Sequence, residues 1–132
     1  MAPRFLADTH VVIRWLTEPK KLSQGQTRIL EESVKRREAV AVSAISLLEI
    51  AALQGSRRLR GNAGRILDVL SADPLFQILP LTFEVALEVV ALGVALHDPA
   101  DRTIVASARV HRLRLLTSDQ RIIDSKFVPV ID

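Results

Sequence analysis

Five acidic residues stand at positions where carboxylates could act together on a phosphodiester. Asp98 and Asp101 lie in the stretch ALHDPADRTIVASA, just before an apolar helical run. The other three are far apart in the chain: Asp8, Glu49 and Asp119. Hard carboxylate oxygens without thiolates select Mg²⁺ or Mn²⁺. Such ions activate water and neutralise phosphate charge, so the chemistry these acids suggest is metal-assisted hydrolysis of a nucleic acid.

Each acid also has a purely structural interpretation. Asp98 before Pro99 is typical of a helix N-cap, and Asp101 then stands where the helix dipole favours a negative charge. The spacing of Ser46 and Glu49 fits a capping box, and the two remaining acids could cap the helices that follow them. Four acids facing one crevice would repel one another, however, and a bound cation is the usual compensation.

The elements that must position these acids alternate between strands and helices. The pattern predicts strands over 5–8, 39–43, 76–81, 113–118 and 126–132, the last at an edge because of Pro129. It predicts helices over 10–16, 23–37, 45–55 (closed by Gly55), 59–73 and 98–112, and one whose apolar face is Phe83, Ala86, Leu87, Val90 and Val94. This α/β alternation predicts a mostly parallel sheet of about five strands flanked by helices. Ligands bind outside the carboxyl ends of such strands, where these acids would converge.

Composition limits the class of protein. The 132 residues, 48% of them hydrophobic, are enough for one domain spanning 1–132. There is no cysteine, which excludes disulfides, thiolate zinc sites and a cysteine nucleophile. No run approaches the roughly 18 apolar residues of a membrane span, and the first ten residues do not read as a signal peptide. We therefore expect a soluble cytoplasmic protein with no membrane partner.

Other catalytic classes find little support. His10, His97 and His111 show no zinc-type spacing, and His10 is expected on the surface or in a supporting role beside Asp8. No GxSxG elbow, GxxxxGK[ST] loop or GxGxxG loop is present. A phosphoaspartate enzyme would place its nucleophile at Asp8, but position 10 lacks the second aspartate of the common phosphatases.

Four segments together resemble PIN-domain proteins, and more narrowly the VapC-type ribonuclease toxins of bacterial toxin–antitoxin pairs. They are FLADTHVVIRWL, AVSAISLLEIAALQG, LHDPADRTIVASA and LLTSDQRI, and the similarity runs from about residue 4 to residue 131. The family's nuclease acids correspond to Asp8, Glu49, Asp101 and Asp119, with Asp98 a further acid of this subgroup. Its supporting polar residue corresponds to Thr117 or Ser118. One departure is Ala100, where related motifs usually have an aromatic residue, and we interpret it as a difference in packing.

The resemblance implies a three-layer PIN fold and a Mg²⁺- or Mn²⁺-dependent endoribonuclease. Asp98 would be either a metal ligand or only a helix cap. Arg102 would steer phosphate or brace the acids by an ion pair. The basic segment could bind the RNA backbone through Arg57, Arg58, Arg60 and Arg65, because an acidic site alone repels RNA. The alternative is a solvated arginine-rich face.

The resemblance also implies partners: a small DNA-binding antitoxin of the VapB type, a second copy of the chain, and toxin–antitoxin hetero-oligomers. We expect an antitoxin groove or dimer contact among eight apolar positions, with plain core as the alternative. They are Val11, Val12, Trp15, Leu16, Leu47, Leu48, Ala51 and Leu53. Two further functions stay open: a catalytically silent RNA-binding or regulatory module of the same fold, and cleavage of DNA instead of RNA.

Overall fold

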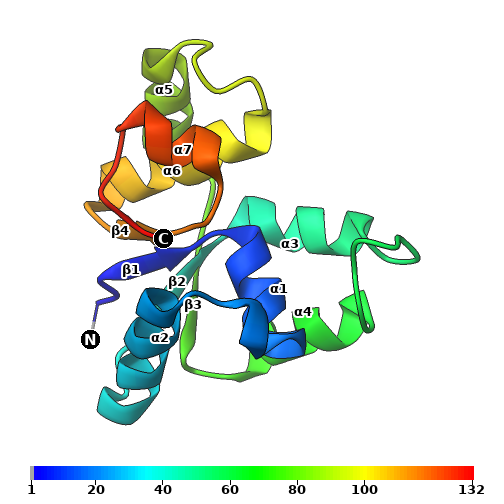
Figure 1. Cartoon of the computed structure of the whole chain (residues 1–132). Coiled ribbons are helices and arrows are strands. Elements are labelled where there is room, and N and C mark those ends of the chain that lie inside the picture. The colour runs from blue at the N-terminus through cyan, green and yellow to red at the C-terminus, as the bar shows by residue number, and fades with distance from the viewer. Residues whose placement is uncertain (1) are drawn as a thin grey trace.

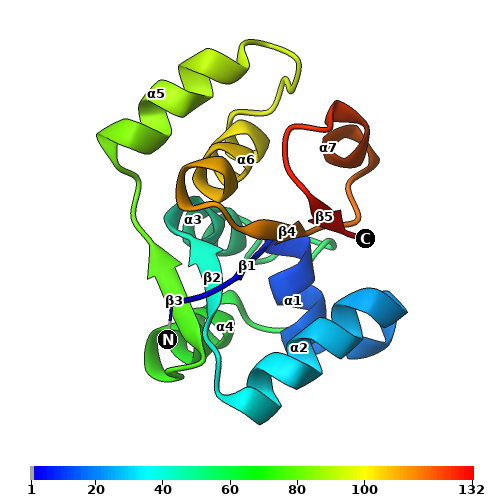
Figure 2. The same cartoon turned by 90° about the vertical axis from the view of Figure 1, so that its left-hand side faces the viewer.

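Five parallel strands form a single sheet in the order β3-β2-β1-β4-β5 in the computed structural model, which describes residues 2–132 (Figures 1 and 2). The strands are β1 (Phe5–Ala7), β2 (Val40–Ser43), β3 (Phe76–Leu79), β4 (Arg114–Leu116) and β5 (Val130–Ile131). The α/β fold with a five-stranded sheet is confirmed, and every described strand pair is parallel. The last strand lies at an edge, as Pro129 predicts.

Helices cover both faces of this sheet, with α1, α2 and α4 on one side and α5, α6 and α7 on the other (Figure 2). Their bounds are α1 (Thr9–Thr17), α2 (Gln24–Arg36), α3 (Ala44–Ala52), α4 (Ala63–Ala72), α5 (Phe83–Leu92), α6 (Pro99–His111) and α7 (Gln120–Ser125), with a short 3₁₀ turn η1 (Pro19–Lys21). None of these helices is long and apolar enough to cross a membrane, as far as residues 2–132 show.

The two hydrophobic cores follow from the alternation of side chains along the strands. Phe5 and Ala7 of β1 face the core shared with α1, α2 and α4, whereas Leu6 between them faces the core shared with α5, α6 and α7. Val42 and Ala41 of β2 divide in the same way. Because both faces are buried, these strands are continuous apolar runs, as is usual for parallel sheets.

Several boundaries differ from the predicted ones. The helix predicted over 59–73 begins only at Ala63, since Asn62 supplies its N-cap and the glycine-containing segment before it forms a loop. The helix predicted over 45–55 ends at Ala52, and Gly55 (φ +80°) lies in the turn beyond it instead of closing it. Helix η1 was not predicted, and α7 was anticipated only as a helix that Asp119 could cap, without bounds, because both are too short to show a helical period.

Helix α5 turns its most regular apolar face to solvent. Phe83, Leu87 and Val90 are 91%, 70% and 77% exposed, whereas Val85 and Leu92 are buried against α6 and its surroundings. The segment FEVALEVVAL is apolar nearly all round, so periodicity alone does not identify the buried side.

Most of the eight positions expected to form a partner groove are core instead. Val11 and Val12 are fully buried, so for them the groove prediction is wrong. Four others pack partly buried against the same core: Trp15, Leu16, Leu47 and Leu53. Only Leu48, which is 66% exposed, and Ala51 remain on the surface. Short helices lying on a sheet bury residues on several sides, which one stripe of a helical pattern does not anticipate.

Candidate active site

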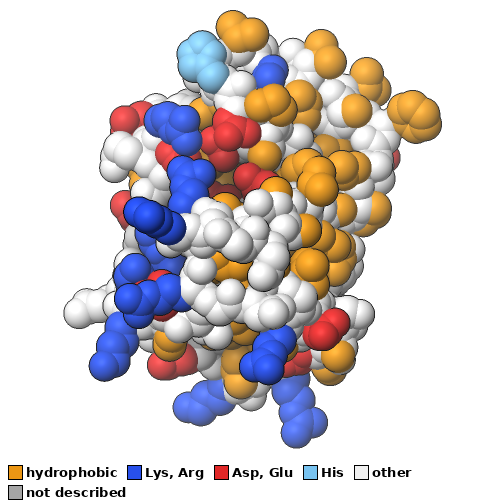
Figure 3. Space-filling model, turned by 90° about the vertical axis from the view of Figure 1, so that its right-hand side faces the viewer, with side chains coloured by type: hydrophobic (Ala, Val, Ile, Leu, Met, Phe, Trp, Pro, Cys, Tyr) orange, Lys and Arg blue, Asp and Glu red, His pale blue; other side chains and the backbone are white. Residues whose placement is uncertain are grey.

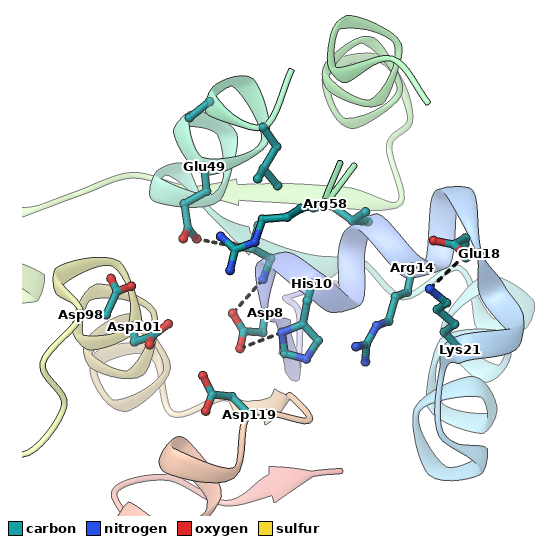
Figure 4. A pocket seen from close by; sticks show the side chains of 14 residues that line it. Asp8, His10, Arg14, Glu18, Lys21, Glu49, Arg58, Asp98, Asp101 and Asp119 are labelled. Atoms are coloured by element: carbon teal, nitrogen blue, oxygen red, sulfur yellow. Dashed lines mark hydrogen bonds and ion pairs between the residues drawn. The ribbon is translucent and has the colours of Figure 1, made fainter. Parts of the chain in front are cut away.

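All five predicted acids line one open pocket of about 650 Å³ at the carboxyl ends of the strands (Figure 4). They arrive from four separate parts of the chain. Asp8 follows β1 and Asp119 lies just beyond β4, the strand that pairs with β1. Glu49 stands on α3, which follows β2, and Asp98 and Asp101 stand at the start of α6. The convergence predicted from the topology of the sheet is confirmed.

Asp8 is the most buried acid of the pocket, with 4% of its surface exposed. Its Oδ1 accepts the backbone N–H of Thr9 at 2.8 Å, so it caps α1. Its Oδ2 accepts the hydroxyl of Thr117 at 2.7 Å. Capping therefore uses one oxygen while the other is oriented by a neighbouring strand, and the structural and functional interpretations of Asp8 are compatible.

His10 supports Asp8 from the side. Its Nε2 accepts the backbone N–H of Ser118 at 2.9 Å, and its Nδ1 lies 3.4 Å from Oδ2 of Asp8. Burial lowers the pKa of His10, and this outweighs the opposing influence of the Asp8 carboxylate. The ring is therefore neutral near pH 7, with its proton on Nδ1 facing Asp8. This placement agrees with the supporting role expected for His10.

Glu49 is oriented by a threonine that the sequence motifs did not single out. The Thr9 hydroxyl lies 2.5 Å from Oε1 of Glu49, to which it donates, and 2.7 Å from the hydroxyl of Ser46. The predicted capping box is wrong, because α3 begins earlier and its N-cap is Ser43. Burial raises the pKa of Glu49 above its ordinary value, and the hydrogen bond from Thr9 opposes the rise.

The two acids of α6 have different surroundings. Asp98 is exposed, and its Oδ1 accepts the backbone N–H of Ala100 at 2.8 Å, so the predicted cap is confirmed. Asp101 stands one turn into the helix and faces the other carboxylates. Burial, followed by the charges of Asp98, Asp8 and Asp119, raises the pKa of Asp101 to about 6.

Asp119 is held by an arginine that sequence analysis missed. It caps α7 through the backbone N–H of Arg121, whose guanidinium Nη2 lies 3.0 Å from Asp119 Oδ2 and 3.2 Å from Asp101 Oδ2. Burial raises the pKa of Asp119, but the hydrogen bonds and charge of Arg121 prevail and hold it below its usual value. The only signal was a cation two residues after the acid, a spacing common on any helix start.

The predicted supporting residues separate into two groups. The Thr117 hydroxyl donates to Asp8 and accepts the backbone N–H of Asp119, whereas the Ser118 hydroxyl accepts from the fully buried Gln26. Arg102 makes no ion pair with a carboxylate in residues 2–132, and its Nη1 lies 3.4 Å from the carbonyl of Gly93. The prediction that Arg102 braces the acids is therefore wrong, because its side chain runs along the preceding loop.

Of the arginines predicted to bind RNA, the structure brings only Arg58 to the pocket. Arg57, Arg60 and Arg65 are exposed but do not line it. Two other cations do line it, namely Arg14 and Lys21. A sequence pattern could not distinguish the cations that line the pocket from those that do not, because neighbouring residues in a loop point in different directions.

The donor set of the pocket fits a hard divalent cation. It consists of carboxylates and hydroxyls, without thiolates, and burial together with the charges of the neighbouring acids raises the pKa of Asp101. Among residues 2–132 no group of three or more acids and histidines stands close enough to enclose an ion as placed. In this arrangement Thr9 donates to Glu49, and Arg121 bridges Asp101 and Asp119.

Comparison with known proteins agrees with this geometry. The PIN domain family model matches residues 5–127. Ribonuclease VapC22 of Mycobacterium tuberculosis is 33% identical over 118 residues, which cover 89% of this chain and 88% of that protein.

Solved structures share the fold at lower identity. VapBC2 from Rickettsia felis, bound to a DNA fragment from its promoter, superposes with a TM-score of 0.72 at 15% identity and covers 96% of both chains. FitAcB from Neisseria gonorrhoeae gives a TM-score of 0.69 at 24% identity, covering 97% of this chain and 96% of the other. With a family model spanning nearly its whole length and the acids converging where the fold places ligands, this chain belongs to the PIN-domain family and is similar to its VapC-type members.

Proposed function

We propose that this chain is a metal-dependent endoribonuclease, acting in the cytoplasm as the toxin of a toxin–antitoxin pair. Asp8, Glu49, Asp101 and Asp119 would hold Mg²⁺ or Mn²⁺. One observation carries the proposal: acids from four separate segments share one pocket, although their charges repel one another. The similarity to Ribonuclease VapC22 supports RNA as the substrate.

The residues of the pocket would divide the work. A divalent ion held by the acids would activate an attacking water and neutralise charge on the scissile phosphate. The Thr117 hydroxyl and neutral His10 orient the Asp8 carboxylate, and the Thr9 hydroxyl orients Glu49. Arg121 compensates the charge of Asp101 and Asp119 and is exposed enough to move away when a cation enters.

The decisive experiment is cleavage of a structured RNA pool by purified protein freed of any antitoxin. It compares Mg²⁺, Mn²⁺ and EDTA for the wild type, for Asp8→Asn, and for Asp68→Asn as an exposed acid of α4 outside the pocket. We expect cutting that needs the metal, disappears in Asp8→Asn and persists in Asp68→Asn. Equal cutting by both variants would contradict the assignment of the site. A parallel pool of single-stranded and duplex DNA tests whether cleavage is restricted to RNA.

The second candidate is a silent module of the same fold, and metal titration distinguishes it. Isothermal titration with Mn²⁺ should show binding that Asp8→Asn weakens and Asp68→Asn does not. A folded chain that binds no divalent ion and cuts no RNA would support the silent module instead. The favoured outcome follows from the complete set of acids, since none of the four predicted positions is missing or turned away from the pocket.

We also propose that the chain pairs with a second copy and with a VapB-like antitoxin. One solved structure that shares the fold is described as a toxin–antitoxin complex from Klebsiella pneumoniae, and others are described as VapBC or FitAB bound to DNA. The exposed apolar side of α5 supports a protein contact, because Phe83, Leu87 and Val90 form a hydrophobic strip that a free monomer would leave in water. Light scattering should give a dimer for the wild type, and Phe83→Ser with Val90→Ser should shift it to the monomer. A wild-type monomer at micromolar concentration would contradict the dimer.

A further inference from the structure

The pocket has two electrically different sides. Asp98 and Asp101 lie at one end of it, Arg14 and Lys21 lie at the other, and the Arg58 side chain reaches from the basic end toward the middle (Figure 4). In the space-filling view, Lys and Arg side chains run along one side of the acidic hollow, and hydrophobic side chains run along the other (Figure 3). The division is therefore a feature of the surface as well as of the pocket lining.

The three cations come from three separate elements. Arg14 stands on α1, four residues after His10 and hence on the same side of that helix. Lys21 ends η1, and Arg58 belongs to the loop between α3 and α4. Arg58 points from this loop toward the acids (Figure 4). Cations that converge from separate elements on one pocket can bind a negatively charged ligand.

Two of these cations have no acidic partner. Within residues 2–132, no carboxylate oxygen lies within 4.0 Å of the guanidinium of Arg14 or Arg58. Lys21 is paired with Glu18 at 3.2 Å, and Arg121 is paired with two acids of the pocket. Arg14 and Arg58 therefore form no ion pair, although six carboxylates, Glu18 among them, line the pocket with them.

We propose that Arg14 and Arg58 bind backbone phosphates beside the scissile one, so that the RNA strand crosses the pocket from the acidic side to the basic side. The inference rests on the proposed ribonuclease function and adds a subsite to it. A guanidinium presents paired N–H donors that match a phosphate. The acids alone repel a polyanion, so a nuclease needs cations beside them to hold the substrate. Lys21 is near enough to add charge but is already compensated by Glu18.

The first test measures binding separately from cleavage. Fluorescence anisotropy follows a labelled single-stranded hexanucleotide RNA on the wild type, Arg14→Gln, Arg58→Gln and Arg57→Gln, in EDTA and in Ca²⁺, over a range of salt. Arg57 is the matched control, because it adjoins Arg58 in the same exposed loop but does not line the pocket. We expect each pocket variant to weaken binding about tenfold. Each should also lower the slope of log K against log salt by about 0.7. Arg57→Gln should change neither.

The second test identifies the bound group. In a series of hexanucleotides, each carries one uncharged methylphosphonate linkage at a different position. If each arginine binds a particular phosphate, removing the charge of that phosphate should abolish most of the binding penalty of the matching variant, Arg14→Gln or Arg58→Gln. Methylphosphonates at other positions should preserve the penalty. Competition with an oligoglutamate of equal charge provides the contrast. If the oligoglutamate displaced RNA at equal concentration, and this displacement depended on Arg14 in the same way, the surface would be a site for an acidic peptide. That result would overturn the proposal.

Kinetics separate this inference from the proposed function. In RNA cleavage we expect Arg14→Gln and Arg58→Gln to raise KM with little change in kcat, because they bind substrate and transition state alike. Wild-type cleavage with the same KM in the pocket variants and in Arg57→Gln would overturn the subsite and leave the nuclease intact. RNA binding that depends on both arginines, in a chain that cuts no RNA, would support the subsite and contradict the nuclease function. Arg14→Lys checks folding on α1 and should recover part of the affinity.

Discussion

The starts of α1 and α6 use the same residue to cap a helix but place it in different surroundings. Asp8 caps α1 with one oxygen, is nearly inaccessible, and receives a second hydrogen bond from Thr117 on the neighbouring strand. Asp98 caps α6 with one oxygen and is exposed, with no further side-chain hydrogen bond in residues 2–132. Capping is thus no evidence against a role in the site, and what distinguishes the two aspartates is the second contact.

At α6, a second acid, Asp101, stands one turn after the cap. Asp101 lines the pocket together with Asp98 but is more buried, and burial, followed by the charges of the other acids, raises the pKa of Asp101 to about 6. At α1, the proposed metal ligand and the cap are one residue. At α6 they are two. This suggests that Asp98 acts mainly as a cap, and four predictions test that division.

The largest expected effect is on the rate of RNA cleavage when single acids of the pocket are replaced. Asp8→Asn and Asp101→Asn should each reduce RNA cleavage by more than about 100-fold, the upper range for residues that only support a metal ligand. Asp98→Asn should lower it only a few-fold. Initial rates at fixed Mg²⁺ measure all three. A loss in Asp98→Asn equal to that in Asp101→Asn would make Asp98 a ligand and erase the contrast.

The next effect concerns the contact that Asp98 lacks. Thr117→Val removes the hydroxyl that Asp8 accepts while it preserves the shape of the side chain. We expect a loss of about 10–100-fold in activity or in Mn²⁺ affinity. Thr103→Val on α6 is the control, because the Thr103 hydroxyl donates only to the carbonyl of Pro99. Equal behaviour of the two variants would show that the Asp8 contact is merely structural.

A pH effect should follow from Asp101. Between pH 3.8 and about 6 the folded protein holds the Asp101 proton more tightly than the unfolded chain does. The free energy of unfolding without metal should therefore fall as pH rises through this window, and Asp101→Asn should flatten the fall. Urea unfolding in EDTA at several pH values measures it. The same slope in Asp101→Asn would show that the raised pKa belongs to another group.

The smallest effect tests the cap itself. Asp98→Ala removes the acceptor for the Ala100 N–H and should cost about 1 kcal/mol of stability, whereas Asp98→Asn should cost much less because asparagine caps as well as aspartate does. Thermal or urea unfolding distinguishes them. If both variants lost the same stability, the charge of Asp98 and not its hydrogen bond would be responsible.

Much of this molecule follows from local sequence. The apolar strand segments predict a parallel α/β sheet, because only strands buried on both faces are apolar throughout. The four acids could be assigned to one edge, because parallel strands end on the same side of a sheet. The helix caps at Asp8, Asp98 and Asp119 were recognisable from the sequence, because a cap depends only on the residues that follow it.

What only the tertiary structure decided depends on contacts between distant segments. The hydrogen bonds of Asp8 with Thr117 and of Thr9 with Glu49 span 109 and 40 residues, and no local pattern encodes them. Arg58 lines the pocket and Arg57 does not, because of the way their loop turns. Which side of α5 is exposed depends on which face α6 covers. Sequence periodicity determines which elements form, whereas their packing determines which side chains meet.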